Sequence, residues 1–218
     1  MPRAKQRTPE LRDRVLQVAV ATLATEGVVG FTTRRVADVA QTSTPAVYEL
    51  FGDKAGLVRG IFFEGFRMLR GCFDRLDETA DPRADLVATI GALRTFVREQ
   101  PALSEVMFSR PFADFDPGPS ELKAGSAVRL FIVGRVRRCA DAGLLSGDET
   151  DIAHVLVSLT QGLAGTEMAG WLGTSRASVD RRWNLAIRAV LDGLRNEARR
   201  VPSHGHRRQR RRTARDHA

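Results

Sequence analysis

The sequence predicts an all-α protein of about nine helices, and two observations carry this prediction. Apolar residues recur at spacings of three and four along nearly the whole chain, and the apolar–polar alternation that is typical of strands is absent. Residues that favour helix starts, namely Ser, Thr or Asp with Pro close behind, precede several of these stripes. No run of about 18 apolar residues occurs, so we expect no membrane-spanning helix.

The first helix is predicted to open at Thr8, with Pro9 in its first turn, and to end at Gly27. Thr22 is the one polar residue within its apolar face. That face consists of Leu11, Val15, Val18, Ala19 and Leu23.

Two short helical patterns follow within residues 31–57, separated by only three or four polar residues. Thr33 can cap the first, and Ser43 or Thr44 can cap the second, which has Pro45 in its first turn and stops near Gly52. Two helices this close together must cross at a steep angle, as in a helix-turn-helix. That geometry lets the second helix lie in a DNA major groove.

Six further helical patterns complete the chain, and Pro, Gly and Asp residues mark the breaks between them. The loop of residues 109–119 is the longest irregular stretch in this part. The predicted helical ranges are 53 to about 78, 81–100, 102–108, 119 or 120 to 143, 148 to about 173, and about 178–200.

The net charge of +8 is concentrated at the C-terminus. Residues 1–60 carry a net charge of +3, residues 61–194 a net charge of −2, and residues 195–218 a net charge of +7. Residues 203–218 contain no large apolar side chain, so we expect this Arg-rich tail to be disordered. It could bind nucleic acid nonspecifically or only aid solubility, and both interpretations remain open.

Cysteine usage and the N-terminus indicate a cytoplasmic protein. The two cysteines, Cys72 and Cys139, are far apart and form no CxxC motif, which argues against a disulfide framework or a zinc site. The basic N-terminal stretch lacks an apolar segment behind it, so we expect no secretory signal. We expect no metal and no cofactor.

The order of residues over 8–60 resembles the TetR (tetracycline-repressor-like) family of transcriptional regulators. The resemblance implies an N-terminal three-helix helix-turn-helix head on a larger helical body that binds small ligands and dimerises through its last two helices. We therefore expect a DNA-binding domain at 8–53, a ligand-binding and dimerisation domain at 54–200, and a tail at 201–218. The matching residues are Glu26-Gly27, Phe31-Thr32-Thr33, Val36-Ala37, Ala40, Ser43, Tyr48, Phe51, Lys54 and Leu57.

The chemistry of the matching positions suits contact with a duplex. Thr33 lies at a helix N-terminus, where a hydroxyl and free backbone amides can bind a phosphate. Arg34 can contact a phosphate or guanine. Tyr48 and Lys54 match positions at which the family contacts phosphates. The DNA-binding residues implied by the resemblance are Thr33, Arg34, Arg35, Thr44, Pro45, Ala46, Tyr48, Glu49 and Lys54.

Three positions depart from the family pattern. Leu50 stands where a histidine is usual, so one phosphate contact is missing. Gln41 replaces the usual glycine of the turn, which requires a turn geometry that tolerates a side chain. Pro45 replaces a common glycine.

The body resembles the family more loosely, and the stretch 100–112 with Gln161 and Trp171 is similar to a WHG-type C-terminal domain. Its aromatic residues can form either core or ligand pocket. The ligand-binding candidates are Phe62, Phe66, Phe96, Met107, Phe108, Phe112 and Phe131. The dimerisation candidates, some of which must instead face the core, are Val157, Gln161, Trp171, Trp183, Ile187, Val190, Leu191 and Leu194.

These features favour a homodimeric repressor that binds a palindromic operator and is released by a small apolar effector. A nonspecific nucleic-acid-binding protein driven by the Arg-rich tail is the alternative. An enzyme is not expected, because no HExxH, GxSxG, glycine-rich phosphate loop or paired ExxH motif occurs. His154 is the one histidine outside the tail, and it has no partner at metal-ligand spacing.

Overall fold

The computed structural model describes residues 8–197, and every regular element in this range is an α-helix. The nine helices of the described range confirm the predicted fold class. The Arg-rich tail lies outside the described residues, as do residues 1–7. The helices are α1 (Pro9–Gly30), α2 (Thr33–Val39), α3 (Thr44–Phe51), α4 (Lys54–Phe73), α5 (Pro82–Glu99), α6 (Pro101–Phe108), α7 (Pro119–Asp141), α8 (Glu149–Met168) and α9 (Arg176–Glu197).

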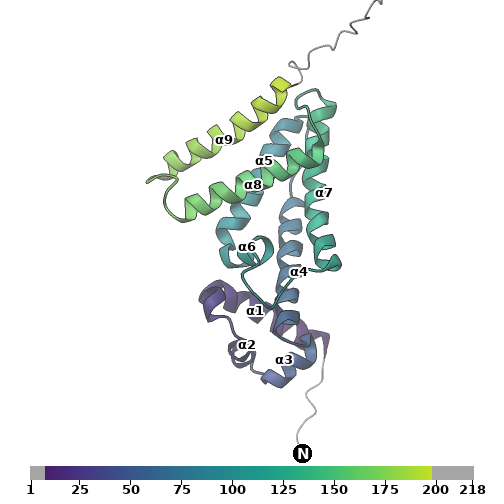
Figure 1. Cartoon of the computed structure of the whole chain (residues 1–218), viewed down its shortest axis with the longest axis vertical. Coiled ribbons are helices and arrows are strands. Elements are labelled where there is room, and N and C mark those ends of the chain that lie inside the picture. The colour runs from purple at the N-terminus through teal and green to yellow at the C-terminus, as the bar shows by residue number, and fades with distance from the viewer. Residues whose placement is uncertain (1–7, 198–218) are drawn as a thin grey trace, which may run out of the picture.

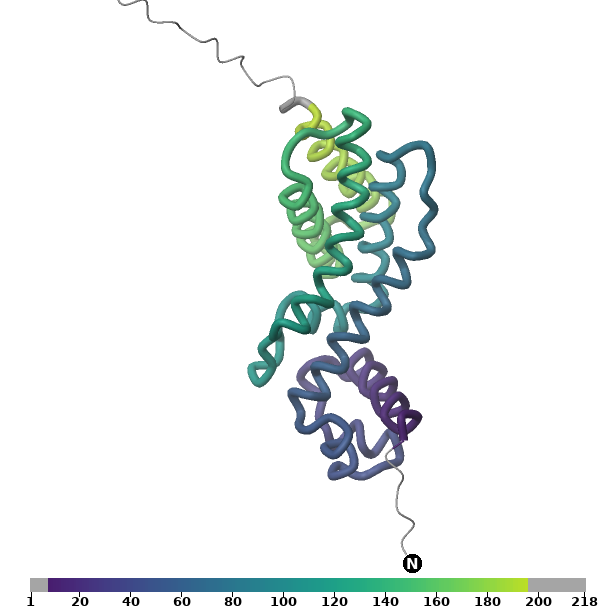
Figure 2. Tube along the Cα trace, turned by 90° about the vertical axis from the view of Figure 1, so that its right-hand side faces the viewer, coloured from purple at the N-terminus to yellow at the C-terminus, as the bar shows by residue number. Residues whose placement is uncertain are grey.

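The molecule is elongated, with α1–α3 at one end and α8 and α9 toward the other (Figure 1). Helix α4 runs from the first group into the second, as the side view also shows (Figure 2). It contacts α1 and α3 near its start and α5, α6 and α7 farther along, while α1 also contacts α6. None of the helices is long and apolar enough to cross a membrane within the described range.

Most helix starts follow the predicted capping residues. The side chains of Thr8, Ser43, Asp53 and Asp81 each accept a hydrogen bond from a backbone N–H in the first turn of their helix. For α2 the prediction was wrong by one residue, because the Thr32 hydroxyl accepts from the Arg35 N–H. Thr33, the predicted cap, is instead the first residue of the helix.

Two predicted helix ends were too late. Helix α4 ends at Phe73 rather than near residue 78, and the link that follows is rich in acidic residues, which are unfavourable at the negative end of a helix dipole. Helix α8 ends at Met168 rather than near residue 173, because Gly170 adopts a φ of 76° that stops the helix. Gly27, with a φ of 67°, breaks α1 as predicted.

The cores of the two ends meet along α4. Leu57 and Ile61 of α4 are fully buried near the head, and Leu69 and Phe73 are fully buried in the body. Close packing of α4 against α6 depends on Gly65, since a Cβ there would overlap the side chain of Met107.

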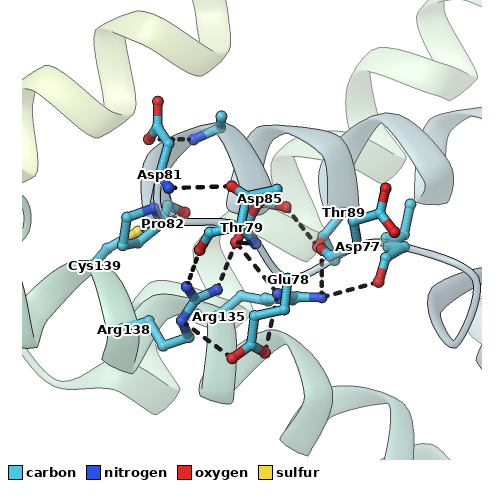
Figure 3. A network of polar contacts seen from close by, with 12 residues as sticks. Asp77, Glu78, Thr79, Asp81, Pro82, Asp85, Thr89, Arg135, Arg138 and Cys139 are labelled. Carbon is cyan, nitrogen blue, oxygen red and sulfur yellow. Dashed lines mark hydrogen bonds and ion pairs between the residues drawn. The ribbon is translucent and has the colours of Figure 1, made fainter.

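The link between α4 and α5 lies at the end of the body away from α1–α3 (Figure 2), and a buried charged network surrounds it (Figure 3). Asp85 of α5 is buried and accepts hydrogen bonds from the backbone N–H and hydroxyl of Thr79 and from Arg138 of α7. Arg135 of α7 lies 3.5 Å from the same carboxylate and also donates to two main-chain carbonyl groups of the α4–α5 link. The network therefore ties that link and α5 to α7.

We predict that Asp85→Asn lowers stability at neutral pH but matters less in acid. Burial raises the pKa of the Asp85 carboxyl, yet hydrogen bonds from Arg138 and Thr79 outweigh it and lower the pKa from 3.8 to about 2. A lowered pKa stabilises the folded state fully above the ordinary pKa, and this contribution is lost as pH falls through the folded value. The difference in free energy of unfolding between variant and wild type should therefore shrink between pH 4 and pH 2.

Urea unfolding at several pH values measures this difference. The exposed Asp114, replaced by Asn, is the matched control and should leave stability nearly unchanged throughout. If the difference in free energy of unfolding between Asp85→Asn and the wild type stays constant down to pH 2, the carboxylate does not act through its charge.

Candidate functional site

Helices α1, α2 and α3 form a small unit that fixes the outward face of α3. Val36 and Ala37 of α2 and Val47 of α3 are fully buried or nearly so. The Arg35 guanidinium lies 2.6 Å from the Glu26 carboxylate, and this ion pair joins α2 to α1. One face of α3 is thus fixed against its neighbours.

The opposite face of α3 is exposed. Val47 is the one buried residue of this helix, whereas Pro45, Tyr48 and Glu49 are exposed and Thr44 is half-buried. The Tyr48 side chain is 42% exposed. A short helix that presents its N-terminal turn and a tyrosine to solvent has the shape that a major groove admits.

The two corners that flank α3 are tight. In the α2–α3 turn Gln41 adopts a φ of 54°, a left-handed conformation that side chains rarely take and that glycine favours. In the α3–α4 corner a Cβ on Gly56 would overlap the main-chain carbonyl of Phe51. These corners set the direction of α3 relative to α2 and α4.

The remaining predicted DNA-binding residues occupy different environments. Arg34 is exposed, and Arg35 is exposed but paired with Glu26 as described. Thr33 is only 5% exposed, so its side chain faces the core of the head. The exposed Thr32 occupies the capping position that was predicted for Thr33. The Lys54 ammonium lies 5.3 Å from the centre of the Phe112 ring. Ala46 is half-buried.

A mainly apolar cavity of about 320 Å³ lies between α4, α6, α7 and α8. Four of the predicted ligand-binding residues line it: Phe62, Phe66, Met107 and Phe108. The charged and polar residues of the same wall were not predicted, because they are separated along the chain and share no motif: Arg110, Glu121, Ser126, Arg129 and His154.

Three predicted ligand-binding residues lie elsewhere. Phe96 lines a separate cavity of about 530 Å³ beside α4 and α5. Phe131 stacks on Phe73, with ring centres 5.1 Å apart. Phe112 packs edge-on against Phe31 of the head at 5.6 Å, so it joins the 109–118 loop to the head instead of lining the cavity.

The predicted dimerisation residues of α9 are mostly turned inward. Trp183, Ile187 and Leu191 are buried within the protomer, so they are among the candidates that face the core. The Trp183 indole donates a hydrogen bond to Glu167 at 2.7 Å, and the Arg94 guanidinium lies 4.6 Å from its ring. These contacts hold this face of α9 against the rest of the protomer. The predicted Val157, Gln161, Val190 and Leu194 are half-buried, and Trp171 is 85% exposed.

Two family models match the chain. Residues 15–61 match a model described as bacterial regulatory proteins of the tetR family, and residues 86–190 match one described as a tetracyclin repressor-like C-terminal domain. Neither description mentions a WHG pattern, so that part of the resemblance stays a prediction. No curated protein matches the sequence significantly.

Solved structures share the fold over nearly their whole length. A protein of unknown function from Rhodococcus sp. RHA1 is 27% identical with a TM-score of 0.73, and the match covers 88% of this chain and 99% of that one. A regulatory protein in the tetR family from Rhodococcus RHA1 is 22% identical with a TM-score of 0.62, over 84% and 98%. AibR in complex with isovaleryl coenzyme A and operator DNA is 14% identical with a TM-score of 0.60, over 86% and 97%.

We predict that Gln41→Gly stabilises the protein. Removing a left-handed side chain relieves about 1–2 kcal/mol, and the greater flexibility of glycine in the unfolded chain takes back about 0.5–1 kcal/mol. The free energy of unfolding from urea titration should rise by roughly 0.5–1 kcal/mol.

Asp38→Gly is the matched control, because Asp38 is exposed and lies within the regular helix α2. Glycine there should lower the free energy of unfolding by about 0.3 kcal/mol, because aspartate is itself a poor helix former. If both variants lose stability equally, the turn at Gln41 carries no strain.

Proposed function

The chain belongs to the TetR family of bacterial regulatory proteins, and on this basis we propose that it is an effector-controlled repressor that binds a palindromic operator as a homodimer. Members of this family are in general transcription factors and not enzymes. The observation that carries the proposal is the exposed outer face of α3, with Tyr48 at its centre. The site of action is chromosomal DNA, hence the cytoplasm.

In this proposal α3 enters the major groove. Thr44, Pro45, Ala46 and Glu49 face the base edges, and Tyr48 donates to a phosphate that sets the register of the helix. Thr32, Thr33, Arg34, Arg35 and Lys54 flank the groove, where backbone amides and cations contact the strands. A two-fold dimer places two such helices about 34–36 Å apart or at a multiple of that spacing.

The outer surface of α8 and α9 supports a homodimer. Small exposed residues recur along one face of α8, so a helix from a second copy can approach closely. Leu185 of α9 is 63% exposed and Trp171 of the linking turn is almost fully so. Aromatic side chains such as tryptophan are enriched in protein–protein interfaces. The small residues on this face of α8 are Ser158, Gly162 and Gly165, and the exposed Ala169 follows at the end of the helix.

The 109–118 loop connects the cavity to the head. Arg110 and Pro117, near its two ends, line the 320 Å³ cavity. Phe112 of the same loop packs against Phe31 and beneath the Lys54 ammonium. A ligand that widens the cavity moves this loop and α6, and both contact the head. Binding then favours a head position that no longer fits the operator, which is a shift between two populations.

Nonspecific nucleic-acid binding by the Arg-rich tail is the second candidate, and the net charge of +7 on residues 195–218 favours it. A variant that lacks residues 203–218 separates the two. Selective binding to one duplex that survives this deletion supports α3 as the reading element, whereas loss of all DNA binding supports the tail.

We predict that Tyr48→Ala weakens binding to the operator by about 1–2 kcal/mol, because one phosphate contact is lost. Fluorescence anisotropy with a labelled operator duplex at fixed salt measures the change. Tyr48→Phe, which keeps the ring and removes the hydroxyl, should lose most of the same affinity. Light scattering should show that both variants keep the oligomeric state of the wild type. An unchanged affinity for the alanine variant would remove Tyr48 from the interface.

We predict that Leu185→Glu converts the dimer to monomer at micromolar concentration, since it places two charges in the proposed apolar interface. Leu130→Glu on α7 is the matched control, because Leu130 is also 63% exposed and belongs to neither of the two helices of the proposed interface. Sedimentation equilibrium distinguishes the two. If both variants sediment like the wild type, the interface lies elsewhere.

A further inference from the structure

The 320 Å³ cavity has an apolar interior and a basic rim. We propose that its ligand is an amphipathic organic anion: an apolar body bearing one carboxylate or phosphate group. This inference rests on the proposed function only in taking this cavity as the effector site.

The interior suits an apolar body of modest size. Phe62 and Phe66 of α4 lie with ring centres 4.9 Å apart, and Phe108 of α6 meets Phe66 edge-on at 5.8 Å. Met107 and Ile132 complete this apolar wall. A volume near 320 Å³ lies at the lower end of the range of roughly 300–1,000 Å³ for small-molecule sites.

The one acidic residue of the described cavity wall is already neutralised. Glu121 is 2% exposed, and the Arg59 guanidinium lies 2.5 Å from its carboxylate. The same carboxylate accepts hydrogen bonds from the Gly118 N–H and the Ser120 hydroxyl, both at 3.0 Å. It therefore offers little attraction to a cationic ligand.

Arg129 is the cation that lacks a counter-charge. Its guanidinium donates to the Ser126 hydroxyl at 3.1 Å, and no carboxylate among the described side chains of residues 8–195 forms an ion pair with it. Like Ser126, Arg129 belongs to the cavity wall. A planar guanidinium presents several donors and binds carboxylate or phosphate oxygens in pairs.

Two further groups on the rim can join the same anion. Arg110 pairs with Asp116 at 3.1 Å, but both side chains are exposed, so this ion pair is weak and can be exchanged for a ligand. Arg110 also adopts a φ of 50°, so the loop holds it at the cavity against its backbone preference. His154 Nδ1 lies 2.9 Å from the Thr150 carbonyl oxygen, which leaves Nε2 for another partner.

Calorimetric titration of the full chain, without DNA, tests the proposal with four probes that share one chain length. These are octanoate, octyl phosphate, 1-octanol and octyltrimethylammonium. We expect one or both anions to bind at least about tenfold more tightly than octanol, the size expected for a charge-assisted hydrogen bond. The ammonium compound should bind most weakly. The relative affinities of the two anions identify the head group.

Arg129→Gln should remove at least about tenfold of the anion affinity and leave octanol binding unchanged. Arg75→Gln is the matched control, because Arg75 is exposed and lines the separate cavity beside α5. It should bind all four probes like the wild type. Octanol binding as tight as the tighter-binding anion, failure of both anions to bind, or full anion affinity in Arg129→Gln overturns the proposal.

The same probes separate this inference from the proposed function. If octanoate binds through Arg129 but leaves the affinity for operator DNA unchanged, the ligand class stands and the proposed coupling fails. If anions do not bind while operator binding is sequence-selective, the regulator stands and the ligand class is wrong.

Discussion

The structure depends on α4 being shared by two cores. Its first half buries Leu57 and Ile61 beside α1 and α3, and its second half buries Leu69 and Phe73 in the body. Helix α3 has eight residues and could not hold its shape alone. Its outward direction is set by the tight corner at Gly56 and by Val47, which is fully buried. A displacement of α4 by the body therefore displaces α3 as well.

The 109–118 loop forms a second connection between the body and the head, in addition to α4. Its Phe112 contacts Phe31 and Lys54, while its ends border the cavity. The head is thus held at two points, through α4 and through this loop, and both segments also border the cavity. In the proposed mechanism, this arrangement lets a ligand remote from α3 control its position without any contact with DNA. The basic rim of the cavity would give that control its chemical selectivity.

The helices and the helix-turn-helix could be predicted from sequence because their signals are local. The caps at Ser43 and Asp81 and the helical spacing of apolar residues lie within a few positions of the structure that they determine. The turn at Gln41 was not predicted, because a geometry that tolerates a side chain was expected there, and Gln41 instead adopts the left-handed conformation that glycine favours. Which of two adjacent threonines caps α2 could not be predicted either, because both residues can do so.

Side-chain direction between distant helices could not be predicted. Phe112 and Phe131 were predicted to line the ligand pocket. They pack instead against Phe31 and Phe73, which lie far away in the sequence. Trp183 faces inward because Arg94 and Glu167 contact it there.

Whether α3 reads DNA sequence is tested most directly by selection from a random duplex library with the full chain and with a chain lacking residues 203–218. We expect both chains to enrich one palindrome with half-sites about one helical turn apart or a multiple of it. If neither chain enriches a common sequence, α3 is not a reading element.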